Sequence, residues 1–283
     1  LANSKDGLML FENGILLQKV AWPEDVKPRE GQIHYLDKGV WDPRPLMIGQ
    51  SRFSPAVFQN VSIITFVSPD CSNEIFSYAV NQASDQVLLN VYEFSSPLMT
   101  DTLIKAHARE VDINVVIEGG PVGGISPEGK EAIRNLTDSG IPVSMMVSRK
   151  GEPAPYRYDH AKYMVIDQRA VLLTSENFKY SGFPPPGMTG NRGWGVYLED
   201  PRLAEYFSTV YQTDYSGKSM TVYNGSAGTP ESMPSGKYTV EFQPGYFTGA
   251  TVRPVISPDT SNQITELINS AEKSIEIEQA YIK

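Results

Sequence analysis

Four polar residues in one short stretch could together hold and attack a phosphate group. His160 and Lys162 lie two positions apart, and Ser175 and Asn177 follow with the same spacing. Alternate residues of an extended strand point to the same side, so each pair is expected to share a face. A neutral imidazole can attack phosphorus near neutral pH, while an ammonium and neutral donors stabilise charge on the phosphoryl oxygens. These residue types suit cleavage of a phosphodiester, and we expect neither a metal ion nor another cofactor.

A hairpin is predicted to bring the two pairs together. If the chain turns back symmetrically about residues 168–169, Asn177 lies opposite His160 and Ser175 lies opposite Lys162. Directly opposed residues have Cβ atoms ~4.5 to 5.5 Å apart, which is close enough to hold one phosphate among four side chains. Gln-Arg is a poor sequence for a two-residue primed turn, so a three-residue loop with another register is the alternative.

The charge around these residues differs from that of the rest of the chain. The whole sequence has 24 Lys and Arg against 33 Asp and Glu, a net charge of −9, which disfavours unspecific binding to nucleic acid. From Arg149 to Arg192 there are seven basic and four acidic residues, a local net charge of +3, which leaves −12 on the other 239 residues. An anionic substrate is therefore expected at this basic region.

The elements that must position these residues follow an α/β pattern. From about Val61, short apolar runs alternate with amphipathic stretches, which is typical of strands and helices in alternation. Ser126-Pro127 is predicted to open a helix, and so is Asp200-Pro201. The expected strands are 62–67, 86–92, 112–118 and 141–147, and one of the expected helices is 128–138.

The first part of the chain has a different character. Residues 7–53 are predicted to form strands, with a tight hairpin at Asn13-Gly14. The later part of this segment resembles the closing strands of a lamin-tail-like domain. That resemblance implies a small all-β segment ahead of the α/β part.

An internal repeat indicates a duplication. Residues 68–75 recur as residues 257–264 at an offset of 189, with six of eight positions identical. After a one-residue slip, 83–94 continues against 271–282. The alternative is that Ser-Pro-Asp is merely a common way to open a helix.

These signals predict four parts of the chain. The predicted order is a small β segment (1–55), the first half of a duplicated α/β fold (56–215), a linker or long loop rich in Ser, Gly, Thr and Pro (216–250), and the start of the second half (251–283). The second half is expected to come from chain beyond Lys283 or from a homodimer partner.

The spacing His160-x-Lys162-x4-Asp167, with Ser175 and Asn177 following, resembles the H-x-K-x4-D signature of the phospholipase D superfamily. This resemblance implies an α/β fold with a mixed sheet flanked by helices. It also implies a phosphohistidine intermediate, with a histidine from each half acting as nucleophile or as proton donor. Lys162 then holds the phosphate, Ser175 and Asn177 bind substrate, and Asp167 orients the catalytic site.

Three further positions bear on this comparison. The family often has an acidic residue where Gly193 stands, so the role of that residue is vacant or passes to Glu176, and Glu176 is a candidate for substrate binding. The family also often has Gly where Thr174 stands. Tyr92, at the end of an expected strand, either lines the cleft and binds substrate or packs in the core.

The expected function is hydrolysis or transfer of a phosphodiester, and the acidic net charge favours a phospholipid-like substrate. A nuclease of the same superfamily is the first alternative. A non-catalytic surface or assembly protein that keeps the fold is the second, because of Gly193 and because the second signature is missing.

The cysteine content and the glycosylation motifs indicate the compartment. Cys71 is the single cysteine, which excludes an internal disulfide and a cysteine-based zinc site. Asn60, Asn135 and Asn224 begin sequons for N-linked glycans. We therefore expect an extracellular or cell-surface location.

Overall fold

The computed structural model describes residues 5–22, 24, 31–37, 39–42, 44–147, 156–215, 220–225 and 228–279. The chain forms two compact units, one of Val57–Val252 and one that combines Leu1–Ala56 with Arg253–Lys283.

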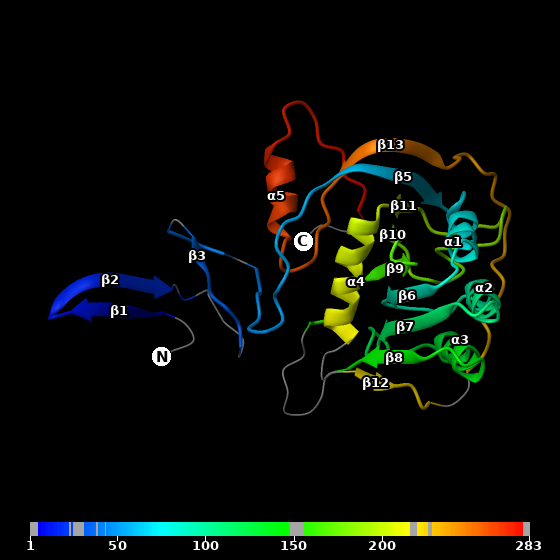
Figure 1. The fold of residues 1–283 in the computed structure, drawn as a ribbon, viewed down its shortest axis with the longest axis horizontal. Helices are drawn as coiled ribbons and strands as arrows, with labels where there is room; N and C mark the ends of the chain where they lie inside the picture. The colour runs from blue at the N-terminus through cyan, green and yellow to red at the C-terminus, as the bar shows by residue number, and fades with distance from the viewer. Residues whose placement is uncertain are drawn as a thin grey trace. The chain divides into compact units, whose positions relative to one another are not determined.

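The larger unit is built on one mixed sheet, as the sequence predicts (Figure 1). Within its described residues the strand order is β12-β8-β7-β6-β9-β10-β11-β5-β13. Strands β6, β7 and β8 run parallel to one another, and the remaining neighbours are antiparallel. The strands are β5 (Phe58–Ser68), β6 (Gln86–Val91), β7 (Asp112–Glu118), β8 (Val143–Met146), β9 (Lys162–Ile166), β10 (Ala170–Thr174), β11 (Gly193–Glu199), β12 (Met220–Val222) and β13 (Gly245–Val252).

Helices cover both faces of this sheet (Figure 1). Met164 of β9 is buried in the core that α1, α2 and α3 share with the sheet, whereas its neighbour Tyr163 contacts Phe207 of α4. Because successive strand residues point to opposite faces, α4 lies on the face opposite to the other three helices. The helices are α1 (Ser72–Asn81), α2 (Pro97–His107), α3 (Pro127–Asp138) and α4 (Pro201–Tyr215).

Serine caps begin two of these helices where the chain has Ser-Pro. The Oγ atom of Ser96 accepts a hydrogen bond from the Met99 N–H at 3.4 Å, and that of Ser126 accepts one from the Gly129 N–H at 3.1 Å. In both cases proline occupies the first helical turn, where its missing N–H costs nothing. The predicted helix start at Ser126-Pro127 is therefore confirmed.

The smaller unit contains the predicted hairpin. Strands β1 (Asp6–Glu12) and β2 (Ile15–Trp22) pair through a turn in which Asn13 and Gly14 adopt φ values of 49° and 80°. The same unit holds the short strands β3 (Leu36–Asp37) and β4 (Val40–Trp41) and the helix α5 (Asn262–Asn269). The resemblance to a lamin-tail-like domain stays a prediction.

Residues 216–250 contain more regular structure than the linker expected from their composition. Strand β12 pairs with β8, and β13 begins at Gly245 and pairs with β5. Residues 216–219 and 226–227 lie outside the described part. No helix among the described residues is both long and apolar enough to cross a membrane.

The predicted register of the β9–β10 hairpin was wrong by one residue. Ile166 lies opposite Ala170 and Tyr163 lies opposite Leu173, so residues 167–169 form a three-residue loop. Asp167 and Gln168 adopt φ values of 51° and 47°. The alternative of a three-residue loop with another register is therefore confirmed. In this register Asn177 does not face His160, and Ser175 does not face Lys162.

Candidate active site

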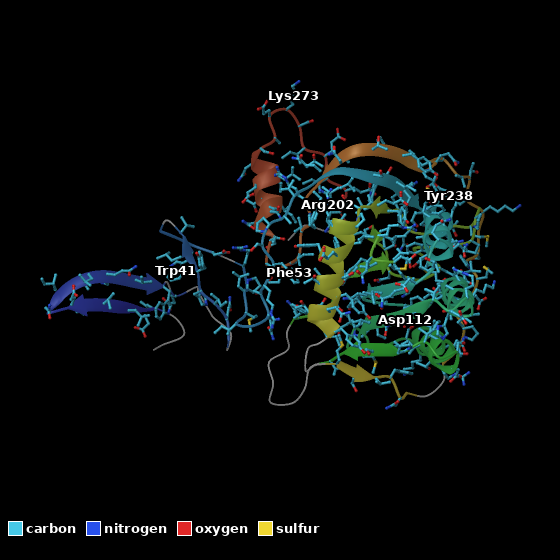
Figure 2. All side chains as sticks on the ribbon, viewed as in Figure 1. Trp41, Phe53, Asp112, Arg202, Tyr238 and Lys273 are labelled. Atoms are coloured by element: carbon cyan, nitrogen blue, oxygen red, sulfur yellow. The ribbon has the colours of Figure 1, made fainter. Side chains whose placement is uncertain are left out.

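Three of the expected site residues, Tyr92, His160 and Lys162, lie where β6 ends and β9 begins. Val91 at the end of β6 pairs with Lys162 at the start of β9, so Tyr92 and Glu93 follow directly beside the residues that precede β9. The Tyr92 N–H donates to the Ala161 carbonyl at 2.9 Å. Asp112, labelled in Figure 2, begins β7 and therefore marks the opposite end of that strand.

His160, Lys162 and Tyr92 form one packed cluster. The Lys162 Nζ atom lies 3.3 Å from Nδ1 and 3.4 Å from Nε2 of His160, and it donates to the His160 carbonyl at 3.1 Å. The ring centroids of Tyr92 and His160 are 4.6 Å apart, and Lys162 Nζ lies 5.4 Å from the Tyr92 centroid. The prediction that His160 and Lys162 share a face is therefore confirmed, and Tyr92 lies against both.

The electrostatics of this cluster suit attack on phosphorus. His160 is exposed, but partial burial lowers its pKa, and the charge of Lys162 lowers it further. Burial also lowers the pKa of Lys162, to about 8, while the nearby charges of Asp159, Glu93 and Glu176 oppose this shift. At pH 7 the imidazole is therefore neutral and most of the lysine is still an ammonium.

Glu118, the last residue of β7, holds the backbone that leads to His160. Its Oε2 atom accepts a hydrogen bond from the Asp159 N–H at 2.7 Å, and its Oε1 atom accepts one from the Gly120 N–H at 2.7 Å. The Tyr92 hydroxyl accepts one from the Val122 N–H at 2.8 Å. The glycine-rich segment after β7 therefore contacts the side chains of both Glu118 and Tyr92. The sequence analysis did not identify Glu118.

Asp159 is a second carboxylate behind His160 that the sequence analysis did not identify. Its side chain is buried, and burial together with the charge of Asp214 raises its pKa to about 7. Asp214 of α4 accepts hydrogen bonds from Asn90 Nδ2 at 3.3 Å and from the Tyr156 hydroxyl at 2.9 Å. An acidic residue directly before the histidine was the sequence signal for this carboxylate.

Asn177 forms a hydrogen bond with Glu93, the residue that follows Tyr92. Its Nδ2 atom donates to Glu93 Oε2 at 2.9 Å, and Lys179 Nζ lies 3.3 Å from the same oxygen. The Phe178 N–H donates to the Glu93 carbonyl at 3.0 Å, which fastens the segment after β10 to the end of β6. A pocket beside Tyr92 is lined by Glu93, Phe94, Ile117, Ile125, Ser126 and Lys179, among others. Sequence reasoning did not include Glu93 or Lys179.

Asp167 lies away from this cluster, at the other end of β9. Its carboxylate accepts hydrogen bonds from the backbone N–H groups of residues 84–86, at 2.9 to 3.2 Å, and from the Ser84 hydroxyl at 3.0 Å. Partial burial opposes ionisation, but these bonds prevail and lower the pKa of Asp167. Asp167 therefore ties the β9–β10 turn to the start of β6, and its predicted role in orienting the catalytic site stays a prediction.

Ser175 and Glu176 form hydrogen bonds with residues at the start of β11 and just before it. The Ser175 Oγ atom accepts a hydrogen bond from the Trp194 N–H at 3.0 Å, and Glu176 Oε2 accepts one from Asn191 Nδ2 at 3.2 Å. A Cβ atom at Gly193 would overlap the Cγ of Glu176 and lie 2.7 Å from its Cδ. The side chain of Glu176 therefore fills the space that a side chain at position 193 needs.

We expect Gly193→Ala to lower the free energy of unfolding by about 1–3 kcal/mol, because the new methyl group displaces the Glu176 side chain. In a Glu176→Ala background the same change should cost less than about 1 kcal/mol, since the overlapping atoms are gone. Chemical denaturation of the four proteins measures this coupling. Gly195→Ala is the matched control, because a Cβ there overlaps the Phe66 ring and should cost the same in both backgrounds. Equal costs of Gly193→Ala in the two backgrounds would contradict the coupling.

The chain is similar to a known protein family and to several solved structures. The family described as "Cardiolipin synthase, PLD-like domain" matches residues 77–215. Two similar solved structures are a phospholipase D family member, Nuc from Salmonella typhimurium (22% identity, TM-score 0.48, 61% of this chain and 100% of that chain), and NucT from Helicobacter pylori (15%, 0.47, 59% and 100%). Another is phosphatidylserine synthase from Haemophilus influenzae (14%, 0.43, 58% and 40%). No curated protein sequence matches the chain.

Proposed function

We propose that the chain is a phosphodiesterase of the phospholipase D superfamily, in which His160 and Lys162 act on the phosphorus centre; the family match over residues 77–215 supports this proposal. The observation that carries the proposal is the packing of the Lys162 ammonium against the neutral imidazole of His160. A neutral imidazole and a fixed positive charge meet there, where the central strand β6 ends and β9 begins. The family match concerns the fold, and the chemistry is argued from this cluster.

The proposed reaction proceeds in two steps at phosphorus. A histidine nitrogen forms a P–N bond while the P–O bond to the leaving alcohol breaks, and the leaving oxygen takes a proton from a second histidine. Water or another alcohol then attacks phosphorus, the P–N bond breaks, and the second histidine takes the proton of the attacking O–H, which restores both histidines. Lys162 stabilises the charge that develops on the phosphoryl oxygens. His160 is either the nucleophile or the proton donor.

A second half is the proposed source of the other histidine. Of the remaining two histidines, His107 ends α2 and contacts the Val111 carbonyl at 3.1 Å, while His34 belongs to the smaller unit, where it packs against Trp41. The duplication predicted from the sequence supports a partner half of the same fold, carried by further chain or by a second copy.

A phospholipid-like diester is the proposed substrate. The net charge of −9 favours a small headgroup over a long polyanion, which would be repelled outside the basic region.

The test compares three substrates with the full-length polypeptide. We expect release of headgroup from phosphatidylcholine vesicles and cleavage of bis(p-nitrophenyl) phosphate, with little cleavage of single-stranded DNA at 150 mM salt. Preferential DNA cleavage that falls steeply with salt would replace the lipid reading with the nuclease reading. No turnover of any of the three by a folded dimer or full-length chain would favour a non-catalytic role.

A further inference from the structure

Asp70 holds the chain that leads into β13. Its side chain is buried at the end of β5, just before α1, and Oδ1 accepts hydrogen bonds from the N–H groups of Glu241 and Phe242 at 2.7 and 2.9 Å. Arg192 Nη1 donates to Oδ2 at 2.7 Å, and the hydroxyl of Tyr238, labelled near α1 in Figure 2, lies 3.1 Å from that oxygen. Burial alone would raise the pKa of Asp70, but these donors lower it.

Asp259 makes the corresponding contact in the other unit. Its buried side chain accepts hydrogen bonds from the N–H groups of Arg52 and Phe53 at 2.5 and 2.8 Å, in the segment that precedes β5. The offset of 189 that relates Asp70 to Asp259 also relates residues 52–53 to residues 241–242. Each carboxylate therefore holds the counterpart of the segment that the other carboxylate holds.

The pairing of β5 with β13 follows the same numerical relation. Ile63 lies opposite Phe247, and Phe58 lies opposite Val252. Val252 lies 189 positions after Ile63, and Phe247 lies 189 positions after Phe58. Each member of one pair is therefore the repeat counterpart of a member of the other pair.

A third pair lies at the centre of this exchange. Val61 lies opposite Ala250, and the offset of 189 maps this pair onto itself. An antiparallel pair that is unchanged by such an exchange has a local two-fold axis, which here passes between Val61 and Ala250.

The backbone and the sequence near this axis repeat as well. Asn60 and Gly249, again 189 positions apart, adopt left-handed φ values of 64° and 71° at the irregularity in the strand pair. The chain entering each strand reads Phe-x-Pro, at residues 53–55 and 242–244. These matches lie ahead of the Ser-Pro-Asp repeat and extend it through both strands.

We infer that β5 and β13 are equivalent first strands of two halves, and that Asp70 and Asp259 are two copies of one carboxylate clamp that locks the halves in register. Each clamp belongs to one half and binds the backbone entering the first strand of the other. Because the contacts are to backbone N–H groups, they fix position without selecting a side chain in the held segment. The inference deepens the proposed function, on which it rests for the existence of a second half.

The test measures unfolding and amide hydrogen exchange for Asp70→Asn and Asp259→Asn in the full-length polypeptide. Asparagine keeps the shape but loses the charge, so each variant should lower the Tm by about 4–8 °C. Exchange should rise in both β5 and β13 in either variant, because the two clamps secure one shared register. Asp101→Asn, at an exposed carboxylate, is the matched control and should change neither readout.

The two-fold relation predicts the same exchange pattern for both variants, so an asymmetric result contradicts it. If Asp259→Asn raises exchange only near residues 52–53 and leaves β5 and β13 protected, the clamp relation is overturned. Should an asparagine variant fail to fold, Asp70→Glu and Asp259→Glu should give the same pattern with smaller amplitude, and an asymmetric pattern there overturns it equally. His160→Ala should leave exchange in both strands unchanged, so failure of the clamp is distinguishable from failure of the proposed chemistry.

Discussion

Replacement of His160 by alanine is expected to reduce phosphodiester cleavage by at least ~10⁴-fold, because neither covalent attack nor proton donation by this residue can then occur. The side chain is exposed, so its removal should leave the fold and the unfolding midpoint nearly unchanged. The measurement is kcat/KM for bis(p-nitrophenyl) phosphate with the full-length polypeptide.

His107→Ala is the matched control for this variant. It also removes an imidazole, but from the end of α2, where Nδ1 contacts the Val111 carbonyl. This variant should keep its activity and lose only some stability. An active His160→Ala protein, or equal loss of activity in the two variants, would contradict the assignment of the site.

Replacement of Lys162 by methionine is expected to lower kcat/KM by about 10²–10³-fold, because the developing charge on the phosphoryl oxygens loses its fixed cation. Methionine fills a similar volume at this buried position, so packing against Tyr92 should survive. A change confined to KM would instead indicate that Lys162 binds ground state and transition state equally.

The pH profile of the unmodified protein provides an independent test of the same residue. Burial lowers the pKa of Lys162 to about 8, so the ammonium is lost as pH rises through that value and the rate should fall above it. The pKa of His160 lies below its ordinary value, so the imidazole stays neutral at pH 7 and becomes protonated only in more acidic solution.

Lys162→Arg distinguishes the alkaline limb of the pH profile, which we assign to Lys162, from the acidic limb, which we assign to His160. Guanidinium keeps its charge far above pH 8, so the alkaline limb should move upward or vanish, while the acidic limb stays in place. An alkaline limb that stays near pH 8 in this variant would show that another group titrates there.

Local signals in the sequence were sufficient for much of the fold. The Asn13-Gly14 hairpin, the serine cap ahead of α3 and the shared face of His160 and Lys162 depend on turn chemistry, capping and the two-residue period of a strand. Each of these depends on residues close together in the chain, so each could be predicted without knowing the topology. The α/β class followed from the alternation of the same signals.

Long-range contacts decided the rest of the site. The β9–β10 register depends on left-handed conformations at the turn and on the capture of the Asp167 carboxylate by the backbone of residues 84–86. No local pattern encodes that capture, because its partners are distant in sequence. For this reason a residue that matches the family signature acts at the far end of the strand from His160.

The sequence by itself determined which residues carry the proposed chemistry and which strand presents them. Tertiary structure alone decided their support: Glu93 and Glu118 come from the ends of β6 and β7, and Glu176 occupies the space left by Gly193. Strand order brings these side chains together. That order arises from burial and backbone pairing across the whole sheet, and the spacing of residues along one segment does not contain it.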